Sequence, residues 1–198
     1  SPCPGDDMPD ISTLIQRWQA GDERAAEALY NQFREPTFRL AYGLLGDPSD
    51  AEDAAQDALA YALAHIGHYE PQRASFSTWL HTITVSRCRD RQRRRHPPSL
   101  SLDWLKGERE HPDPAPGPEP RTVRAETHGE VWKAIQVLSP PLREAILLRY
   151  WAGHTFREMA DILSCPLPTA QSRVRLAYVQ LRTRLTPADL NALEEGAR

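Results

Sequence analysis

The chain has 198 residues, which is enough for one domain or for two small ones. Its formal net charge is −3, from 24 basic and 27 acidic residues, and this value by itself indicates no particular partner. The cysteines, Cys3, Cys88 and Cys165, are far apart and include no C-x-x-C pair. The composition therefore predicts neither a disulfide framework nor a zinc ribbon, and a reducing cytosol is the natural environment.

The charges are segregated along the sequence. The stretch VSRCRDRQRRR, residues 85–95, has six arginines against one aspartate, whereas DPSDAEDAAQD, residues 47–57, has five acids and no base. Such a chain can present faces of opposite charge to two different partners. No apolar run approaches the ~18 residues of a membrane span and no signal segment opens the chain. We therefore expect a soluble, cytoplasmic protein without membrane insertion.

The pattern of apolar residues is helical almost throughout. No stretch alternates as a half-buried strand would, so we expect an all-α protein. The first two helices are expected to begin after Asp10 and after Gly21-Asp22, because an aspartate can cap each helix. Pro36 permits a break or kink of the chain before Phe38.

The next two predicted helices carry opposite charges. The turn GDPSDAE, residues 46–52, contains Ser49 and Glu52 at the spacing of a capping box, which predicts a helix from there to about Ile66. Its apolar stripe is mostly alanine, so neighbouring helices can approach it closely. After a loop, FSTWLHTITVSRCRDRQRRR, residues 76–95, predicts a helix whose last two turns are almost purely basic.

A proline-rich segment then interrupts the chain. Between His96 and Pro120 lie seven of the 18 prolines, interleaved with Gly, Asp and Glu. Such a composition offers little to bury and lacks backbone donors, so it predicts a flexible linker. We expect two small helical domains, residues 1–95 and 128–198, joined by the linker 96–127.

The second domain ends in two short helices around a turn. Thr155 and Glu158 form a capping box that starts the first of them, and Pro166 and Pro168 enclose the turn before the second. The second helix has a buried stripe at intervals of four, three and four, namely Ala170, Val174, Ala177 and Leu181. Its other faces are polar and cationic, with Thr169, Gln171, Ser172, Arg173, Arg175, Arg182 and Arg184.

This arrangement is the helix-turn-helix pattern, whose second helix enters the major groove of DNA. Arginine can bind guanine or phosphates through two hydrogen bonds, and glutamine can read adenine. By pattern alone, an ordinary helical hairpin with a solvated basic face is the alternative.

Taken together, the segments resemble an extracytoplasmic-function sigma factor, from the small two-domain class of bacterial sigma-70-related initiation factors. The resemblance covers the chain from Ile11 to Leu185. In the first domain it rests on GDERAAEALYNQF, GDPSDAEDAAQDALAYA and FSTWLHTITVSRCRDRQRRR, and in the second on LSPPLREAILLRYWAGHTFREMADILSCPLPTAQSR. The order, the spacing and the intervening linker make the combination specific.

The resemblance implies a role for each segment. The acidic helix matches the surface that grips the clamp helices of RNA polymerase core, with Asp50, Asp53, Gln56 and Asp57. The loop and helix that follow match the part that captures the minus-10 promoter element, with Tyr69, Phe76, Trp79, His81, Ser86, Arg87, Arg91 and Arg94. The helix-turn-helix matches the minus-35 reader, with Thr155, Thr169, Gln171, Ser172, Arg173 and Arg175. The family also implies an anti-sigma factor as a partner.

These roles agree with the chemistry of the residues. Opened DNA needs aromatic and polar surfaces for unstacked bases and cations for the backbone. Some positions depart from the family pattern: Ser86 replaces the usual Asn, Ser164 replaces Gly in the turn, and Pro168 and Ala170 replace Gly and Val. These departures bear on which promoter sequence the protein prefers more than on its function. We also expect Ser164 to adopt a positive φ.

Other classes of function remain as alternatives. A stand-alone helix-turn-helix regulator would carry a helical sensor or dimerisation domain in front, and a helical adaptor would bind no nucleic acid. The arginines at the end of the first domain favour the sigma-factor interpretation over a sensor. The sequence has no phosphate-binding glycine loop, nucleophile elbow or paired catalytic acids, so we expect no enzyme. His65 and His68 lack further ligands, so we expect no metal and no cofactor.

Overall fold

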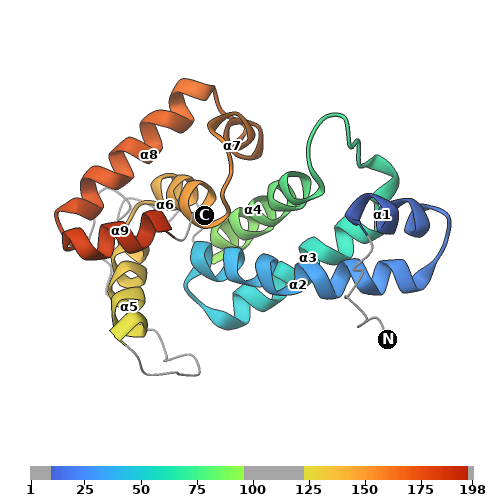
Figure 1. Ribbon diagram of the computed structural model, residues 1–198, viewed down its shortest axis with the longest axis horizontal. Helices are drawn as coiled ribbons and strands as arrows, with labels where there is room; N and C mark the ends of the chain where they lie inside the picture. Colours follow the sequence, from blue (N-terminus) through green and yellow to red (C-terminus); the bar gives the residue numbers. More distant parts are fainter. Residues whose placement is uncertain (1–9, 96–122, 196–198) are drawn as a thin grey trace, which may run out of the picture.

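The computed structural model describes residues 10–95 and 123–195, with side chains for 10–95 and 129–191 (Figure 1). These residues form helices, and no strand occurs among them. The prediction of an all-α fold with two helical regions is therefore confirmed.

The first region contains four α-helices. They are α1 (Ile11–Gln19), α2 (Glu23–Leu45), α3 (Pro48–Ala64) and α4 (Phe76–Arg95), with a short 3-10 turn, η1 (Ile66–His68), after α3. The carboxylate of Asp22 caps α2 by accepting a hydrogen bond from the Arg24 backbone N–H at 3.0 Å, as predicted. The break that Pro36 permits does not occur, since α2 continues through this residue. Proline lacks the backbone N–H that would donate a helical hydrogen bond. The burial of a continuous apolar stripe along α2, which includes Leu29, Phe33 and Leu40, outweighs this loss.

The start of α3 corrects one detail of the sequence interpretation. Its cap is Asp47, which accepts a hydrogen bond from the Asp50 backbone N–H at 2.8 Å, and Pro48 occupies the first turn. Ser49 was the wrong choice, because proline already has the φ of a first helical residue and so moves the cap to the residue before it. The alanine stripe is confirmed: Ala51, Ala54 and Ala58 are fully buried.

The second region contains five α-helices and one wide turn. The helices are α5 (Val123–Gln136), α6 (Pro140–Ile146), α7 (Phe156–Leu163), α8 (Leu167–Arg182) and α9 (Pro187–Glu195). A π-helical turn, η4 (Leu147–Trp151), continues α6. The sequence suggested neither this wide turn nor the start of α5 at Val123, which precedes the expected end of the linker at residue 127.

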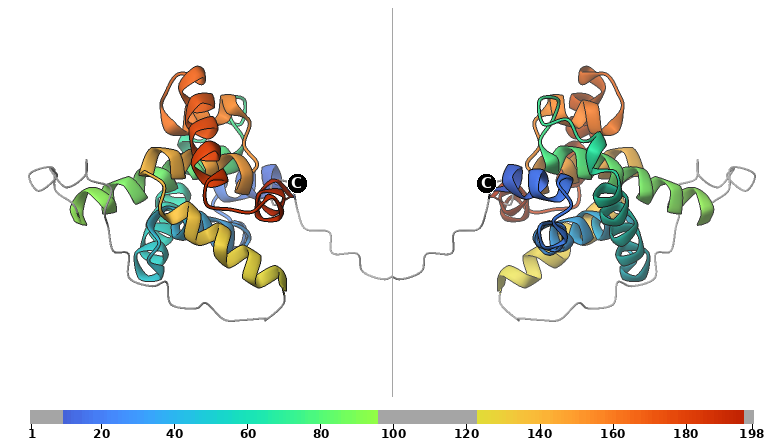
Figure 2. Two further views of the ribbon diagram at one scale, coloured as in Figure 1. Left: turned by 90° about the vertical axis from the view of Figure 1, so that its left-hand side faces the viewer. Right: turned by 90° about the vertical axis from the view of Figure 1, so that its right-hand side faces the viewer.

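The two regions share a buried core. One cluster joins residues of α2 and α4, such as Leu44 and Val85, to residues of the second region, such as Ile146 and Leu148. A second cluster lies within the first region, around Leu29 and Leu80. The side views show α7 and α8 on one side of α4 and α2 and α3 on the other (Figure 2). The two halves therefore pack as one body in this structure.

The turn between α7 and α8 contains a strained residue. Ser164 has φ 51° and ψ 50°, the left-handed conformation expected for it. Replacing Ser164 with glycine should raise the free energy of unfolding by about 0.5 to 1 kcal/mol, because glycine adopts this conformation without a Cβ clash. Urea unfolding followed by circular dichroism measures the change. The helical control Ser172→Gly should instead lower stability, and equal losses for both variants would disprove the strain.

Candidate functional site

The acidic face of α3 borders a groove. The side chains of Asp53 and Asp57 are 57% and 64% exposed, whereas Asp50 is only 14% exposed. Gln56 is exposed and lines a hollow of about 510 Å³ between α2 and α3, together with Tyr30, Asn31, Arg34, Glu35, Phe38 and Glu52. The groove has mixed apolar and polar walls, and Asp53 and Asp57 lie on the same helix as its α3 residues, Glu52, Ala55, Gln56 and Leu59.

An arginine predicted to contact DNA bridges the acidic face. The Arg91 guanidinium lies 3.4 Å from the Asp50 carboxylate, 3.1 Å from that of Asp53 and 3.7 Å from that of Asp57. Arg95 lies 2.5 Å from the other Asp50 oxygen. In these pairs the Asp53 and Asp57 carboxylates are exposed to solvent, although the Arg91 side chain is only 25% exposed, so the aspartates remain accessible to a partner's charges.

The aromatic residues predicted to contact the minus-10 element pack against one another. The Tyr69 ring lies 5.5 Å from the rings of both Phe76 and Trp79, and its hydroxyl donates to the Ala74 carbonyl at 3.1 Å. Partial burial raises the pKa of Tyr69. Phe76 is buried in the core beneath this pair, and Trp79 is half-buried. These contacts fix the loop that precedes α4 and leave part of Tyr69 and Trp79 accessible.

The remaining residues predicted for this site lie on different faces of α4. Ser86 and Arg94 are exposed, and the Arg87 guanidinium lies 4.8 Å from the centre of the Tyr61 ring. His81 is buried, and its Nδ1 lies 2.6 Å from Nε2 of His154 in the second region. The structure therefore gathers Tyr69, Trp79, Ser86, Arg87 and Arg94 toward solvent, and places His81 and Phe76 inside.

The predicted capping box at the start of α7 is confirmed. The Glu158 backbone N–H donates to the Thr155 hydroxyl at 3.3 Å, and the Thr155 backbone N–H donates to the Glu158 carboxylate at 2.8 Å. Burial, the largest single influence, raises the pKa of Glu158, but hydrogen bonds to its carboxylate from the Thr155 backbone N–H and hydroxyl and from the Thr78 hydroxyl outweigh burial and lower the pKa. Upstream, Gly153 at φ 72° follows the π-helical turn and directs His154 toward α4.

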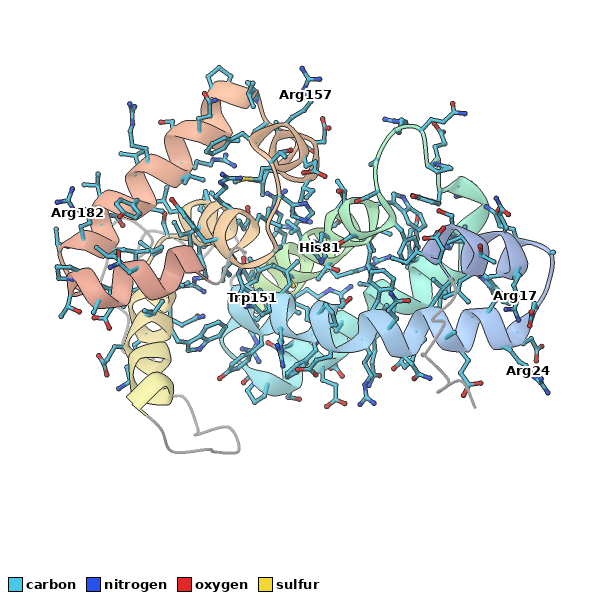
Figure 3. All side chains as sticks on the ribbon, viewed as in Figure 1. Arg17, Arg24, His81, Trp151, Arg157 and Arg182 are labelled. Carbon is cyan, nitrogen blue, oxygen red and sulfur yellow. The ribbon has the colours of Figure 1, made fainter. Side chains whose placement is uncertain are left out.

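The second helix of the motif, α8, presents the predicted faces. The apolar stripe of Ala170, Val174, Ala177 and Leu181 is buried, as expected. Gln171 is exposed near its start and Arg175 at its middle, whereas Thr169, Ser172 and Arg173 are half-exposed. Arg182 is exposed at the end of the helix, and Arg184 is exposed just beyond it. Figure 3 shows Arg157 near the turn that precedes α8 and Arg182 at the opposite end of the helix.

Several exposed groups near the predicted surfaces could not be recognised from the sequence. Arg157, on the outer side of α7, lies next to the end of α8 that carries Gln171, and Arg73 is exposed in the loop before α4. The groove residues of α2, such as Tyr30 and Arg34, were overlooked too. An isolated arginine in a loop or on a short helix gives no periodic signal, whereas the capping box at Thr155 could have drawn attention to Arg157.

No helix in the described ranges is long and apolar enough to cross a membrane. Within the same ranges, no three His, Cys, Asp or Glu side chains gather as a metal site would require.

Comparisons with known proteins identify both regions. Residues 29–97 match the family described as sigma-70 region 2, and residues 128–181 match sigma-70 region 4. The chain is 29% identical over 181 residues to the RNA polymerase sigma-H factor of Pseudomonas aeruginosa, covering 88% of this chain and 93% of the relative. Over the same length it is 28% identical to the ECF RNA polymerase sigma factor SigW of Bacillus subtilis, covering 88% of this chain and 96% of the relative.

Solved structures agree with these matches. The sigma factor RpoE, in complex with the anti-sigma factor NepR from Bartonella quintana, superposes with a TM-score of 0.64 at 25% identity, over 79% of this chain and 94% of that one. CnrH, in complex with the cytosolic domain of CnrY, shares the fold with a TM-score of 0.62 at 19% identity, over 88% and 96%. With both conserved regions present in order, the chain belongs to the sigma-70 family and is an RNA polymerase sigma factor of the extracytoplasmic-function type, which directs core polymerase to promoters and promotes DNA opening.

Proposed function

We propose that this sigma factor divides promoter recognition among three surfaces. The acidic face of α3 and the adjoining groove bind core polymerase, the loop before α4 and the outer side of α4 bind the minus-10 element, and α8 reads the minus-35 element. The observation that carries the proposal is the separation of charge: exposed acids lie on α3, and exposed arginines lie on α8 and at the end of α4. A sensor domain in front of the motif is not favoured, since residues 29–97 match sigma-70 region 2.

The polymerase surface is proposed from exposure and shape. Asp53 and Asp57 present their carboxylates beside the groove that Gln56 lines. A basic helix of the polymerase can seat apolar side chains between α2 and α3 while its cations replace Arg91 on the acids. Arg91 would then be released toward DNA, which reconciles its observed pairing with the role predicted for it.

The minus-10 surface is proposed from its aromatic and cationic groups. Tyr69 and Trp79 expose ring surface beside the loop, and Ser86, Arg87 and Arg94 follow along α4. Bases stack on such rings without regard to sequence, and the arginines hold the backbone phosphates. Arg73, exposed in the loop, adds a cation to the same surface.

The minus-35 surface is proposed from the position of each side chain along α8. Gln171 and Arg173 lie in the first half of α8, which enters the groove in this motif, and Arg175 lies at the middle of the helix. Arg157 lies beside the start of α8, where we expect DNA phosphates.

Replacing Arg175 with alanine should cost about 1 to 3 kcal/mol of binding at a cognate minus-35 element and change the preferred sequence, because the side chain reads a base edge. Arg184→Ala, beyond the end of α8, should weaken all promoters slightly and equally. Transcription from a library of minus-35 sequences with core polymerase measures both. If the two variants weaken every promoter alike, α8 serves only as an electrostatic contact.

We also propose an anti-sigma factor as a regulatory partner, by extension from RpoE and CnrH, whose structures were solved with NepR and with CnrY. Affinity capture from the native cell under non-inducing conditions tests the proposed anti-sigma partner: recovery of polymerase without any inhibitory protein would argue against it.

We further propose that the chain acts in the cytoplasm, because polymerase and promoter DNA are there, and that it has no enzymatic activity of its own.

A further inference from the structure

The helices α3 and α4 face each other through a row of charged side chains spaced one turn apart. Arg95 lies 2.5 Å from the Asp50 carboxylate, and Arg91, one turn earlier on α4, lies 3.1 Å from that of Asp53. Arg91 also reaches Asp57, one turn further along α3, at 3.7 Å. In this part of the row, each arginine is therefore paired with carboxylates.

The next position of the row breaks this pattern. Residues four apart share one side of a helix, so the row continues with Arg87 on α4 and Tyr61 on α3. The Arg87 guanidinium lies 4.8 Å from the centre of the Tyr61 ring. A cation–π contact attracts the guanidinium to the ring but leaves its formal charge uncompensated.

Arg87 lacks a partner of opposite charge in the part of the chain whose side chains are described, residues 10–95 and 129–191. Its Nε is buried there and has no hydrogen-bond partner. Arg89, two residues later, is by contrast paired with Glu144 at 2.7 Å. Arg94 is exposed and keeps the freedom of a solvated side chain. Arg87 thus combines a fixed side chain with an uncompensated charge.

The support behind Arg87 is itself fixed. The His65 ring, one turn after Tyr61, stacks on the tyrosine with centroids 4.1 Å apart and an interplanar angle of 19°. At the same end of α3, Trp18 Nε1 of α1 donates to the Leu63 carbonyl at 2.9 Å. These contacts restrict the Tyr61 ring before any ligand arrives, although 38% of the residue remains exposed.

Arg87 lies within the surface proposed for the minus-10 element. It follows Ser86 directly, and Arg94, seven residues later, lies on the same side of α4. A DNA strand that follows this side of the helix must pass the Arg87 guanidinium. A guanidinium can bind a phosphate through two parallel hydrogen bonds, and a side chain that is already ordered loses less entropy on binding.

We propose that Tyr61 is a positioning residue of the minus-10 surface, which holds Arg87 so that its guanidinium binds a backbone phosphate of the opened promoter strand. The inference rests on the proposed assignment of α4 to the minus-10 element. A carboxylate at position 61 would extend the row of acids and neutralise Arg87. The tyrosine ring instead holds the cation and leaves its charge for DNA.

The test uses holoenzyme assembled from core polymerase and the full-length chain. Its ligand is a fluorescent single-stranded oligonucleotide with the minus-10 sequence of a promoter that this holoenzyme transcribes. Tyr61→Glu should lower the affinity on the order of tenfold, because the new carboxylate pairs with Arg87 and competes with the phosphate. The slope of log affinity against log salt should become shallower by about 0.7, the value for one phosphate contact on a single strand.

Two further variants separate the ring from its hydroxyl and from the arginine. Tyr61→Phe keeps the ring and should preserve both the affinity and the salt dependence. Tyr61→Leu should weaken binding several-fold in the natural chain and have no further effect beside Arg87→Ala. Such non-additivity is expected where the tyrosine acts through the arginine.

Stability distinguishes positioning from simple packing. Tyr61→Glu should leave the free energy of unfolding in urea unchanged, because the new pair with Arg87 offsets the repulsion from Asp57 one turn away. Binding therefore falls while stability does not. Gln16→Glu, at an exposed position of α1 outside the three proposed surfaces, makes the same change of net charge and should alter neither measurement.

Unchanged affinity and salt dependence in Tyr61→Glu would overturn the proposal. So would equal losses from Tyr61→Leu with and without Arg87, because the ring would then act independently of the arginine. A failure of the minus-10 assignment looks different, since Arg94→Ala would then leave the salt dependence unchanged as well. If Arg94→Ala makes the slope shallower while the Tyr61 variants do not, the assignment stands and the positioning role is wrong.

Discussion

Replacing both Asp53 and Asp57 with lysine should reduce the affinity for core polymerase by at least about a hundredfold. Each substitution turns an attraction to a basic helix into a repulsion, and like charges facing each other at an interface cost several kcal/mol. The fold should survive, because the two side chains are 57% and 64% exposed and only their pairs with Arg91 are lost. Co-purification with core polymerase measures the loss, and circular dichroism measures the fold.

A matched control lies at the other end of the first region. Glu23 and Glu27 are exposed near the start of α2, so lysine at both positions makes the same change of net charge away from the groove. That variant should bind core polymerase as the natural chain does. Equal binding by the Asp53/Asp57 variant and the control would show that the acidic face of α3 is not the polymerase contact.

The helix-turn-helix could be predicted because its signals are local. The capping box at Thr155 and Glu158 lies within one turn, and the stripe from Ala170 to Leu181 lies within one helix. The strained Ser164 follows from the same short segment, since the turn geometry needs a left-handed residue there. None of these features depends on a distant part of the chain.

The helix α4 is buried on two sides, against the first region and against the second. The side toward the second region could not be predicted from local signals in the sequence. Phe76 and Leu80 are buried in the core of the first region, and His81, Thr84 and Cys88 of the same helix are buried as well. A helix buried on two sides loses the single apolar stripe on which periodicity relies, and its partner lies beyond the linker. The assignment of His81 to the minus-10 surface therefore took no account of His154.

Charged residues that are buried between the two regions also could not be predicted from the sequence. Arg143 and Glu144 are 7% and 6% exposed, although their types are usually found at the surface. Their burial becomes understandable only when Arg89 and the last carbonyls of α2 are placed beside them. The close approach at Gly43 likewise depends on Leu147, more than a hundred residues later.

Acidification should open the contact between the two regions. Burial, with a contribution from the neighbouring His154, lowers the pKa of His81 to about 3. Burial also lowers the pKa of His154, although the Glu158 carboxylate partly opposes this. The Glu158 carboxylate itself accepts a hydrogen bond from the Thr78 hydroxyl, and Arg149 donates to the His154 carbonyl. When the regions separate, His81 should titrate near its ordinary pKa of about 6.5.

The sign follows from which form binds more protons. Between pH 6.5 and 3, His81 is protonated when the two regions are separated and neutral when they are in contact. The contact is therefore fully stable above pH 6.5 and weakens as the pH falls. The free energy that holds the two regions together should fall by about 1.4 kcal/mol at pH 5.5 and by about 2.7 kcal/mol at pH 4.5. These losses raise the fraction of molecules with separated regions roughly tenfold and a hundredfold. Carboxylates with lowered pKa values, such as that of Glu158, lose their contribution only at lower pH.

The distance between fluorophores attached at the exposed residues Gln72 and Asp161, measured from pH 7.5 to 4.5, should report this opening. Circular dichroism shows whether the helices persist. His81→Gln should remove most of the dependence, because an amide does not titrate in this range. His65→Gln, at a histidine outside the interface that bonds only its own helix through the Tyr61 carbonyl, should preserve it. If His81→Gln opens with the same pH dependence as the natural chain, other groups govern the opening and the histidine contact is merely packed into the interface.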